Sequence, residues 1–210
     1  MTVPMMPIET TIDAKLARLG ELTTLVTLIS PLPAFVSCHK SALEKKDMLA
    51  KISFNFLMAM FVTNMVWLAY SIKIANSDLI VINALGSIIA GTFVSIYIHT
   101  QIAAHDLTYG KPFILIFAAG IGFAWILSAP NFLLGTWWNG FAATSLSMTQ
   151  YLFTLDSVKS VLATKDPSKV NLTVAIACMF NSYAWACYAI LTNDPFVLVP
   201  NIAGFCTGLL

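Results

Sequence analysis

The sequence carries little charge. Lys and Arg supply 11 and Asp and Glu 10 of its 210 residues, so 10% of the chain is charged, against about 25% in a soluble domain. Apolar residues make up 58%, and the mean hydropathy is +0.81. These values exclude a soluble globular domain and also a disordered chain, which needs low hydrophobicity. The net charge of +1 excludes a nucleic-acid-binding protein, which needs a basic face.

Sequence motifs for enzyme chemistry and metal binding are also missing. The four cysteines lie inside apolar stretches, without a CxxC pair or a Cys/His cluster: Cys38, Cys178, Cys187 and Cys206. The sequence has no GxSxG, no HExxH and no phosphate-binding glycine loop. We therefore expect the protein not to be an enzyme and to use no metal or cofactor.

The sequence does contain seven apolar segments, and a membrane-spanning helix needs about 20 apolar residues. They lie at residues 22–39, 52–74, 79–101, 112–134, 137–158, 170–192 and 195–210. We predict an all-α integral membrane protein with seven transmembrane helices, preceded by a tail at residues 1–21. The last segment has fifteen residues from Phe196 to Leu210, or about 22 Å of helix. We expect either that the sequence stops before the helix ends or that something outside the chain completes the helix.

The basic residues predict the orientation in the membrane, because Lys and Arg favour cytoplasmic loops. They gather in the first, third and fifth connections: Lys40, Lys45, Lys46, Lys51, Lys111, Lys159, Lys165 and Lys169. The alternate connections contain only Lys73. We therefore expect the N-terminus outside and the C-terminus in the cytoplasm.

An internal repeat is the most specific signal. Trp67, Tyr70, Asn83 and Gly86 recur 118 residues later as Trp185, Tyr188, Asn201 and Gly204. Both copies read W-x2-Y-x12-N-x2-G and cross a polar turn between two apolar segments. Chance similarity of two apolar helices is the alternative, but a shared apolar composition alone rarely produces four identities at one constant spacing.

The repeat predicts two parallel three-helix units, because equivalent helices of the same orientation need an odd number of spans between them. The first unit would cover residues 22–104, the linker helix 112–134 and the second unit 137–210. This 3+1+3 arrangement is related by an axis along the membrane normal, a symmetry known from transporters.

The motifs in these segments resemble the SWEET sugar transporters, a family within the PQ-loop (MtN3/saliva-like) superfamily. The run Asp194-Pro-Phe-Val-Leu-Val-Pro-Asn201 is similar to the start of the last helix of that family. Ser30-Pro31-Leu32-Pro33-x-Phe35 resembles the signature late in its first helix. The resemblance covers residues 20–210 and implies facilitative, bidirectional sugar movement by a seven-helix protein.

The resemblance also implies which residues form the site. Five would bind the substrate: Asn83, Asn201, Trp185, Asn64 and Ser182, the last as the repeat mate of Asn64. Four would form gates: Trp67, Tyr188 and Asp194 at the outer gate, and Pro31 at the inner one.

The chemistry of these residue types agrees with a sugar site. An asparagine side chain offers an acceptor and two donors, and the flat face of Trp185 can contact the apolar surface of a sugar ring. The alternative is that Asn83 and Asn201 only bond neighbouring helices. No charge lies deep in any predicted span, so a coupling ion has no obvious site and we expect a uniporter.

Two other functions stay open. A proton-coupled exporter of amino acids or similar solutes would depend on Asp156, and a non-transporting seven-helix sorting receptor would bind a ligand without flux. We expect a small sugar and the lipid bilayer as partners, with a homo-oligomer possible and nucleic acid excluded. The plasma membrane is the expected location, with the Golgi or another endomembrane as the alternative. The identity of the sugar is left open.

Overall fold

The computed structural model describes residues 11–36, 54–105, 107–128, 135–165 and 172–209, and these ranges are helical, with no strand. Seven long helices follow one another: α1 (Thr11–Ile29), α4 (Phe54–Lys73), α5 (Ser77–Ala104), α6 (Leu107–Ser128), α7 (Thr136–Thr164), α8 (Leu172–Thr192) and α9 (Pro195–Gly208). A short helix, α2 (Leu32–Val36), follows α1. The predicted all-α fold is confirmed.

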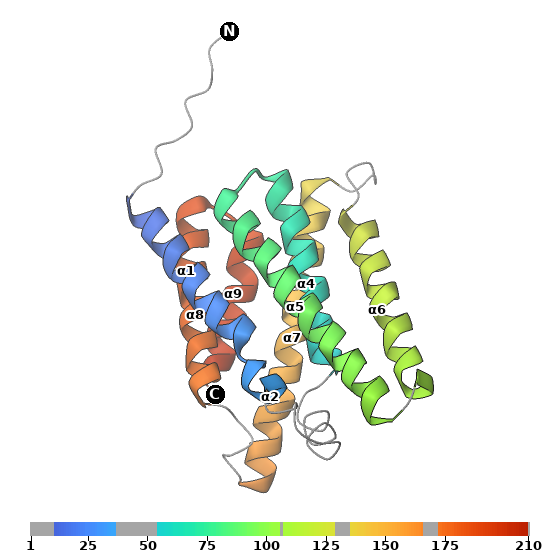
Figure 1. Ribbon diagram of the computed structural model, residues 1–210. Helices are drawn as coiled ribbons and strands as arrows, with labels where there is room; N and C mark the ends of the chain where they lie inside the picture. The colour runs from blue at the N-terminus through green and yellow to red at the C-terminus, as the bar shows by residue number, and fades with distance from the viewer. Residues whose placement is uncertain (1–10, 37–53, 106, 129–134, 166–171, 210) are drawn as a thin grey trace.

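The helices form two bundles of three with the same internal order. In the first bundle α5 packs against both α1 and α4, and in the second α9 packs against both α7 and α8. The bundles meet through two equivalent pairs, α1 with α8 and α4 with α7 (Figure 1). The remaining helix, α6, lies against α4 and α5. The structure therefore has the predicted 3+1+3 arrangement.

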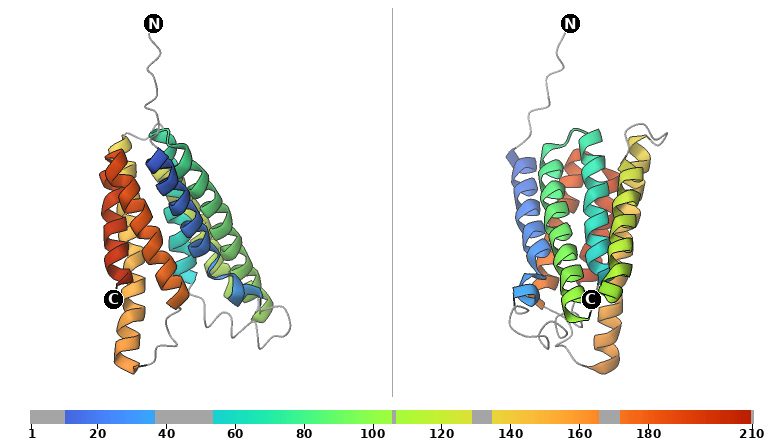
Figure 2. Two further views of the ribbon diagram at one scale, coloured as in Figure 1. Left: turned by 90° about the vertical axis from the view of Figure 1, so that its left-hand side faces the viewer. Right: turned by 45° about the vertical axis from the view of Figure 1, so that its right-hand side comes forward.

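The two bundles are not parallel along their whole length. They lie close together at the end that holds the α4–α5 and α8–α9 turns, and they diverge toward the opposite end (Figure 2, left). Helix α1 begins at the first end and α9 ends toward the second (Figure 1). We call the first end, where α1 begins, the outer end.

The first helix begins at Thr11 rather than near Leu22, so residues 11–21 of the expected tail are helical. Polar side chains of this segment form ion pairs at the outer end, where Arg18 pairs with Glu21 in α1 and with Asp78 in α5. The helix then stops at Ile29, and Pro31 lies in the turn before α2. Proline lacks the N–H that would continue the helix, so the break lies at Pro31, the predicted inner-gate residue.

Two equivalent caps start the third helix of each bundle. The side chain of Asn76 accepts a hydrogen bond from the backbone N–H of Leu79 at the start of α5. The side chain of Asp194 accepts from Phe196 and Val197 at the start of α9. A capping side chain of this kind satisfies N–H groups that have no partner within the helix. The caps are 118 residues apart, so they belong to the repeat, with Asp194 as its charged member.

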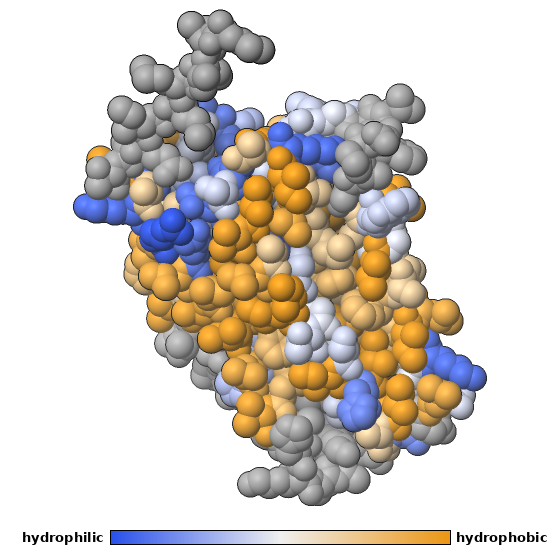
Figure 3. Space-filling view, turned by 45° about the horizontal axis from the view of Figure 1, so that its top comes forward, coloured by the Kyte–Doolittle hydropathy of each residue, from blue (hydrophilic) through white to orange (hydrophobic). Residues whose placement is uncertain are grey.

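The apolar surface agrees with a membrane protein. Apolar side chains form a broad band across one face, and hydrophilic ones gather toward its ends (Figure 3). Within the described residues, α4 and α5 are each long and apolar enough to cross a membrane, judged by length and hydropathy alone.

Candidate functional site

A cavity of about 230 Å³ lies between the two bundles. Helices of both halves line it, with only the linker helix α6 and the short α2 taking no part. Its polar lining consists of hydroxyl, amide, indole and thiol groups: Thr24, Thr27, Thr63, Asn64, Trp67, Asn83, Ser147, Gln150, Tyr151, Cys178, Asn181, Ser182, Trp185 and Asn201. None of the described lining residues carries a charge. The cavity thus offers many hydrogen bonds without an ion-pairing group.

The repeated asparagines occupy equivalent places in this cavity. Asn83 in α5 donates from Nδ2 to the carbonyl of Leu79, and Asn201 in α9 donates from Nδ2 to the carbonyl of Val197, both at 2.7 Å. Each bond uses one of the two amide N–H groups and neither lone pair of the oxygen. The bond to the helix's own carbonyl fixes the orientation of the amide. The second N–H and the oxygen of each amide lie at the cavity wall.

The two repeated glycines explain the last position of the motif. A Cβ atom on Gly86 would overlap the side chain of Asn64, and one on Gly204 would overlap the side chains of Ser182 and Tyr151. Glycine therefore lets α5 approach the polar side chain of α4, and lets α9 approach that of α8. Asn64 and Ser182 are repeat mates, so each half uses the same close contact.

The repeated tryptophans reach across the interface between the halves. The indole N–H of Trp185 in α8 donates to the hydroxyl of Thr24 in α1 at 2.9 Å. The indole N–H of Trp67 in α4 donates to the hydroxyl of Ser147 in α7 at 2.9 Å. These bonds hold both rings in the cavity wall.

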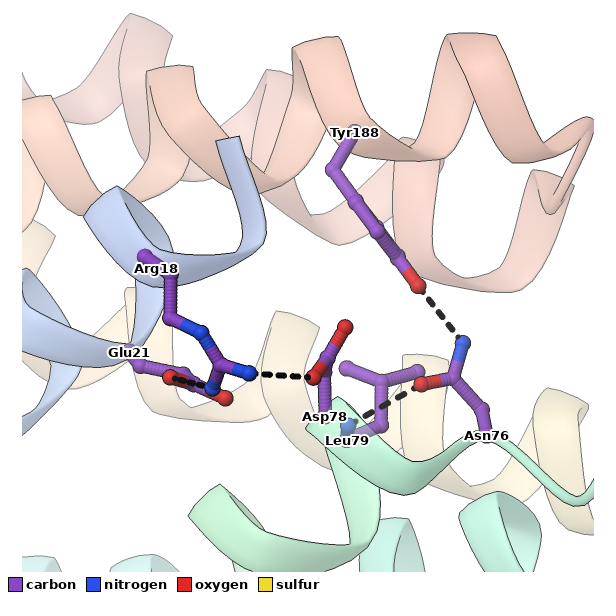
Figure 4. A network of polar contacts seen from close by, with 6 residues as sticks. All are labelled: Arg18, Glu21, Asn76, Asp78, Leu79 and Tyr188. Carbon is purple, nitrogen blue, oxygen red and sulfur yellow. Dashed lines mark hydrogen bonds and ion pairs between the residues drawn. The ribbon is translucent and has the colours of Figure 1, made fainter. Parts of the chain in front are cut away.

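Toward the outer end, reciprocal tyrosine bonds join the halves. The hydroxyl of Tyr70 in α4 donates to the carboxylate of Asp194, at 3.0 Å from Oδ1 and 2.9 Å from Oδ2. The amide of Asn76 donates to the hydroxyl of Tyr188 in α8 at 2.7 Å (Figure 4). Each tyrosine thus contacts the cap at the start of the other half's third helix. We call these four residues the outer layer.

The outer layer adjoins a charged cluster in the first half. The guanidinium of Arg18 lies 2.7 Å from Glu21 and 3.6 Å from Asp78 (Figure 4). Asp78 follows the cap residue Asn76 by two positions at the start of α5. In the second half, aromatic rings pack at this end instead, with Trp137 stacked on Phe141 and edge-on to Phe196. The outer ends of the two halves therefore differ in polarity although their backbones correspond.

The structure places the predicted site residues as follows. All five predicted substrate-binding residues line the cavity. Of the predicted gate residues, Tyr188 and Asp194 belong to the outer layer, whereas Trp67 lines the cavity and contacts Tyr70 edge-on. Pro31 lies apart from them, in the turn between α1 and α2. Asp156 lies in α7, but its side chain is outside the described part of the structure.

Several residues of the cavity and of the outer layer were not predicted as site residues. Asn181 accepts hydrogen bonds from Thr23 at 3.1 Å and from Thr24 at 2.6 Å, and so ties α8 to α1. Asn76 could have been found, because it lies 118 residues before Asp194. Thr24 gave no such signal, since α1 has no counterpart to the repeated motif.

Comparisons with known proteins agree with this geometry. The family model described as "Sugar efflux transporter for intercellular exchange" matches residues 15–104 and 139–210. Sugar transporter SWEET1 of Mus musculus is 25% identical over 150 residues, which cover 71% of this chain and 67% of the mouse protein. Bidirectional sugar transporter SWEET11 of Oryza sativa subsp. japonica is 24% identical over 191 residues, which cover 89% of this chain and 60% of the rice protein.

The fold is also that of a solved structure. A eukaryotic SWEET transporter superposes with a TM-score of 0.79 at 16% sequence identity, covering 94% of this chain and 92% of that chain.

Proposed function

This chain belongs to the family of sugar efflux transporters for intercellular exchange, the SWEET transporters, and on that premise we propose that it is a facilitative, bidirectional sugar uniporter. The observation that carries the proposal is the uncharged polar cavity between the two halves. A neutral solute with many hydroxyl groups fits such a lining. A coupling proton would need a carboxylate or a histidine as its carrier within the membrane, and the described lining contains neither.

In the proposed site, Asn83 and Asn201 hold the sugar from opposite halves. Each keeps an acceptor and a second N–H beyond the bond to its own helix. Trp185 contributes a flat aromatic face, and Asn64 and Ser182 add polar groups at repeat-equivalent places. Because the sugar is hydrogen-bonded by residues of both halves, its binding depends on the relative orientation of the two halves.

Alternating access supplies the transport step of the proposal. The structure has the halves joined at the outer layer and diverging toward the opposite end (Figure 2). Breaking the Tyr70–Asp194 and Tyr188–Asn76 bonds while the other ends approach would open the cavity outward. The break at Pro31 provides a place where α1 can bend during this change.

The protein is a multi-pass membrane protein. We propose that its outer end faces the extracellular side, with the C-terminus in the cytoplasm, because the basic residues gather in the connections at the other end. The plasma membrane is the proposed location. In this proposal α1, α4 and α5 serve as the first half, α6 as the linker, and α7, α8 and α9 as the second half.

Counterflow in liposomes tests the proposal. Vesicles containing the protein and unlabelled D-glucose or sucrose should accumulate the matching labelled sugar transiently, without a pH gradient. Asn83→Ala and Asn201→Ala should each lower flux more than tenfold, because a polar substrate loses a hydrogen bond in a desolvated site. The control is Asn55→Ala, which changes an exposed asparagine of α4 and should leave flux unchanged.

The same vesicles separate the other functions. Flux that requires a pH gradient and disappears in Asp156→Asn would replace uniport by proton coupling. Saturable sugar binding without any flux would indicate a receptor. Normal flux in both Asn83→Ala and Asn201→Ala would remove the site assignment while leaving transport intact.

A further inference from the structure

Serine and threonine hydroxyls in these helices have a common partner. A hydroxyl in a helix can donate to the backbone carbonyl four residues earlier. Nine of them do so in the described helices: Thr23, Thr27, Ser71, Ser87, Thr92, Ser95, Thr100, Thr149 and Thr192. Such bonds satisfy a polar group that has no access to water.

Thr63 in α4 departs from this pattern. Its side chain is buried, with 5% of the residue exposed, and its Oγ1 has no hydrogen-bond partner among the described residues. A buried hydroxyl without a partner is unfavourable, because it has lost its hydrogen bonds to water and gained none in the protein. The packing of α4 therefore gives no reason why this position carries a hydroxyl group.

The position of Thr63 suggests what the hydroxyl is for. Thr63 lines the cavity next to Asn64, on the face of α4 that also carries Met60 and Trp67. Thr63 and Asn64 each lie three or four positions from both Met60 and Trp67, so the four residues share one side of the helix. Thr63 thus belongs to the wall of the proposed sugar site, and its Oγ1, which neighbouring atoms cover, reaches the cavity when the side chain rotates.

The other half of the repeat supports this reading. The residue 118 positions after Thr63 is Asn181, which also lines the cavity. The oxygen of Asn181 is occupied by the hydroxyls of Thr23 and Thr24 in α1. Among the described side chains, Thr63 has no equivalent bond to α7, where Ser147 instead accepts the Trp67 indole N–H. The Asn181 oxygen is thus hydrogen-bonded, whereas the hydroxyl at the equivalent position of α4 is not.

We propose that the Thr63 side chain rotates to present its hydroxyl to the cavity, where it binds one hydroxyl group of the transported sugar and helps to determine which sugar is carried. The proposal rests on the proposed function and adds a binding residue to its site. The hydroxyl can both donate and accept, so it matches a sugar hydroxyl in either role. A site built to bond a substrate hydroxyl discriminates strongly against the analogue that lacks it.

Thr63→Val tests the proposal, because valine keeps the shape and removes the hydroxyl. Counterflow of D-glucose should show KM raised about tenfold, with Thr63→Ser close to the original protein. Monodeoxy-glucose analogues serve as competitors. One of them should compete poorly with glucose in the original protein, and this difference should vanish in Thr63→Val.

Thermal unfolding of the sugar-free protein provides a second readout. Thr100→Val is the matched control, because Thr100 is equally buried but bonds the carbonyl of Ile96 at 2.8 Å. Thr100→Val should lower Tm and leave the deoxy-sugar pattern unchanged, whereas Thr63→Val should leave Tm unchanged or raise it.

Three outcomes can be told apart. Glucose flux with unchanged KM and an unchanged deoxy-sugar pattern in Thr63→Val would overturn the role of Thr63 and leave the proposed function standing. A loss of Tm in Thr63→Val as large as in Thr100→Val would overturn it too, whether or not sugar is carried. Absence of glucose and sucrose flux in the original protein would count against the proposed function itself.

Discussion

The Tyr70 hydroxyl is the strongest single link in the outer layer, because its partner Asp194 is charged. Hydrogen bonds to charged groups contribute about 1.5–3 kcal/mol. Tyr70→Phe removes this bond and keeps the ring that contacts Trp67 and Phe196 edge-on. We expect Tyr70→Phe to raise the population that is open at the outer end by roughly tenfold. Asp194→Ala is less informative, since it also removes the cap of α9.

A thiol in the cavity measures this population. Cys178 lines the cavity, and a protein with Cys38, Cys187 and Cys206 changed to serine keeps it as the single cysteine. An impermeant thiol reagent added from outside should modify Cys178 faster in Tyr70→Phe. Tyr97→Phe is the control, because the Tyr97 hydroxyl contacts Gln101 within α5. Equal modification rates in the two variants would contradict a closing role for Tyr70.

At the level of single residues, the sequence reveals repeated positions better than unrepeated ones. Asn83 and Asn201 stand out because the same side chain recurs at a fixed spacing, and both line the cavity. Thr63 and Asn181 also have that spacing but differ in type, so no identity marks them. Whether the Thr63 hydroxyl has a partner depends on which atoms of α4 and α7 meet, which the sequence of one helix does not contain.

Helices α4 and α5 depend on Gly86 for their close approach. Gly86→Ala should push the Asn64 side chain aside, lower stability by about 1–3 kcal/mol and reduce sugar flux. Gly122→Ala in α6 is the control, because a Cβ there meets nothing within 4 Å. It should leave flux unchanged and stability equal or slightly higher, since alanine favours the helix.

The double variant Gly86→Ala with Asn64→Ala separates packing from binding. Shortening Asn64 removes the overlap, so thermal stability should recover while flux stays low. Full stability in Gly86→Ala alone would show that α5 does not need glycine at this contact.

The helices differ in how far their bounds and pairing could be predicted. The motif across α4 and α5 recurs across α8 and α9, and both pairs form as expected. Helix α1 gave no match to α7, because the two tryptophans bond Thr24 and Ser147, which are 123 rather than 118 residues apart. The polar start of α1 also concealed the helix, since Arg18 pairs with Asp78 of α5, a contact that depends on the fold.

For the whole molecule, the proposed orientation makes opposite ends accessible from opposite sides. Ser77→Cys places a thiol at the α4–α5 turn, and Lys165→Cys places one at the end of α7, both at exposed positions. In intact cells an impermeant reagent should label Ser77→Cys, and Lys165→Cys should react only after permeabilisation. The reverse pattern would invert the topology without changing the fold.

The overall 3+1+3 arrangement was the most predictable feature, because it depends on hydropathy and on one spacing. The relative placement of the halves was not predictable, since it depends on side-chain contacts such as Tyr70 with Asp194.

The uneven attachment of α6 has a consequence for how the protein is built. This helix packs against α4 and α5 and has only a small contact with α7. If the halves rock, α6 travels with the first, so a four-helix body moves against a three-helix body. A chain divided between Ser128 and Thr136 would separate α1–α6 from α7–α9 and so keep α6 with its own body. We expect the two fragments, produced together, to reassemble, because α1 packs against α8 and α4 against α7.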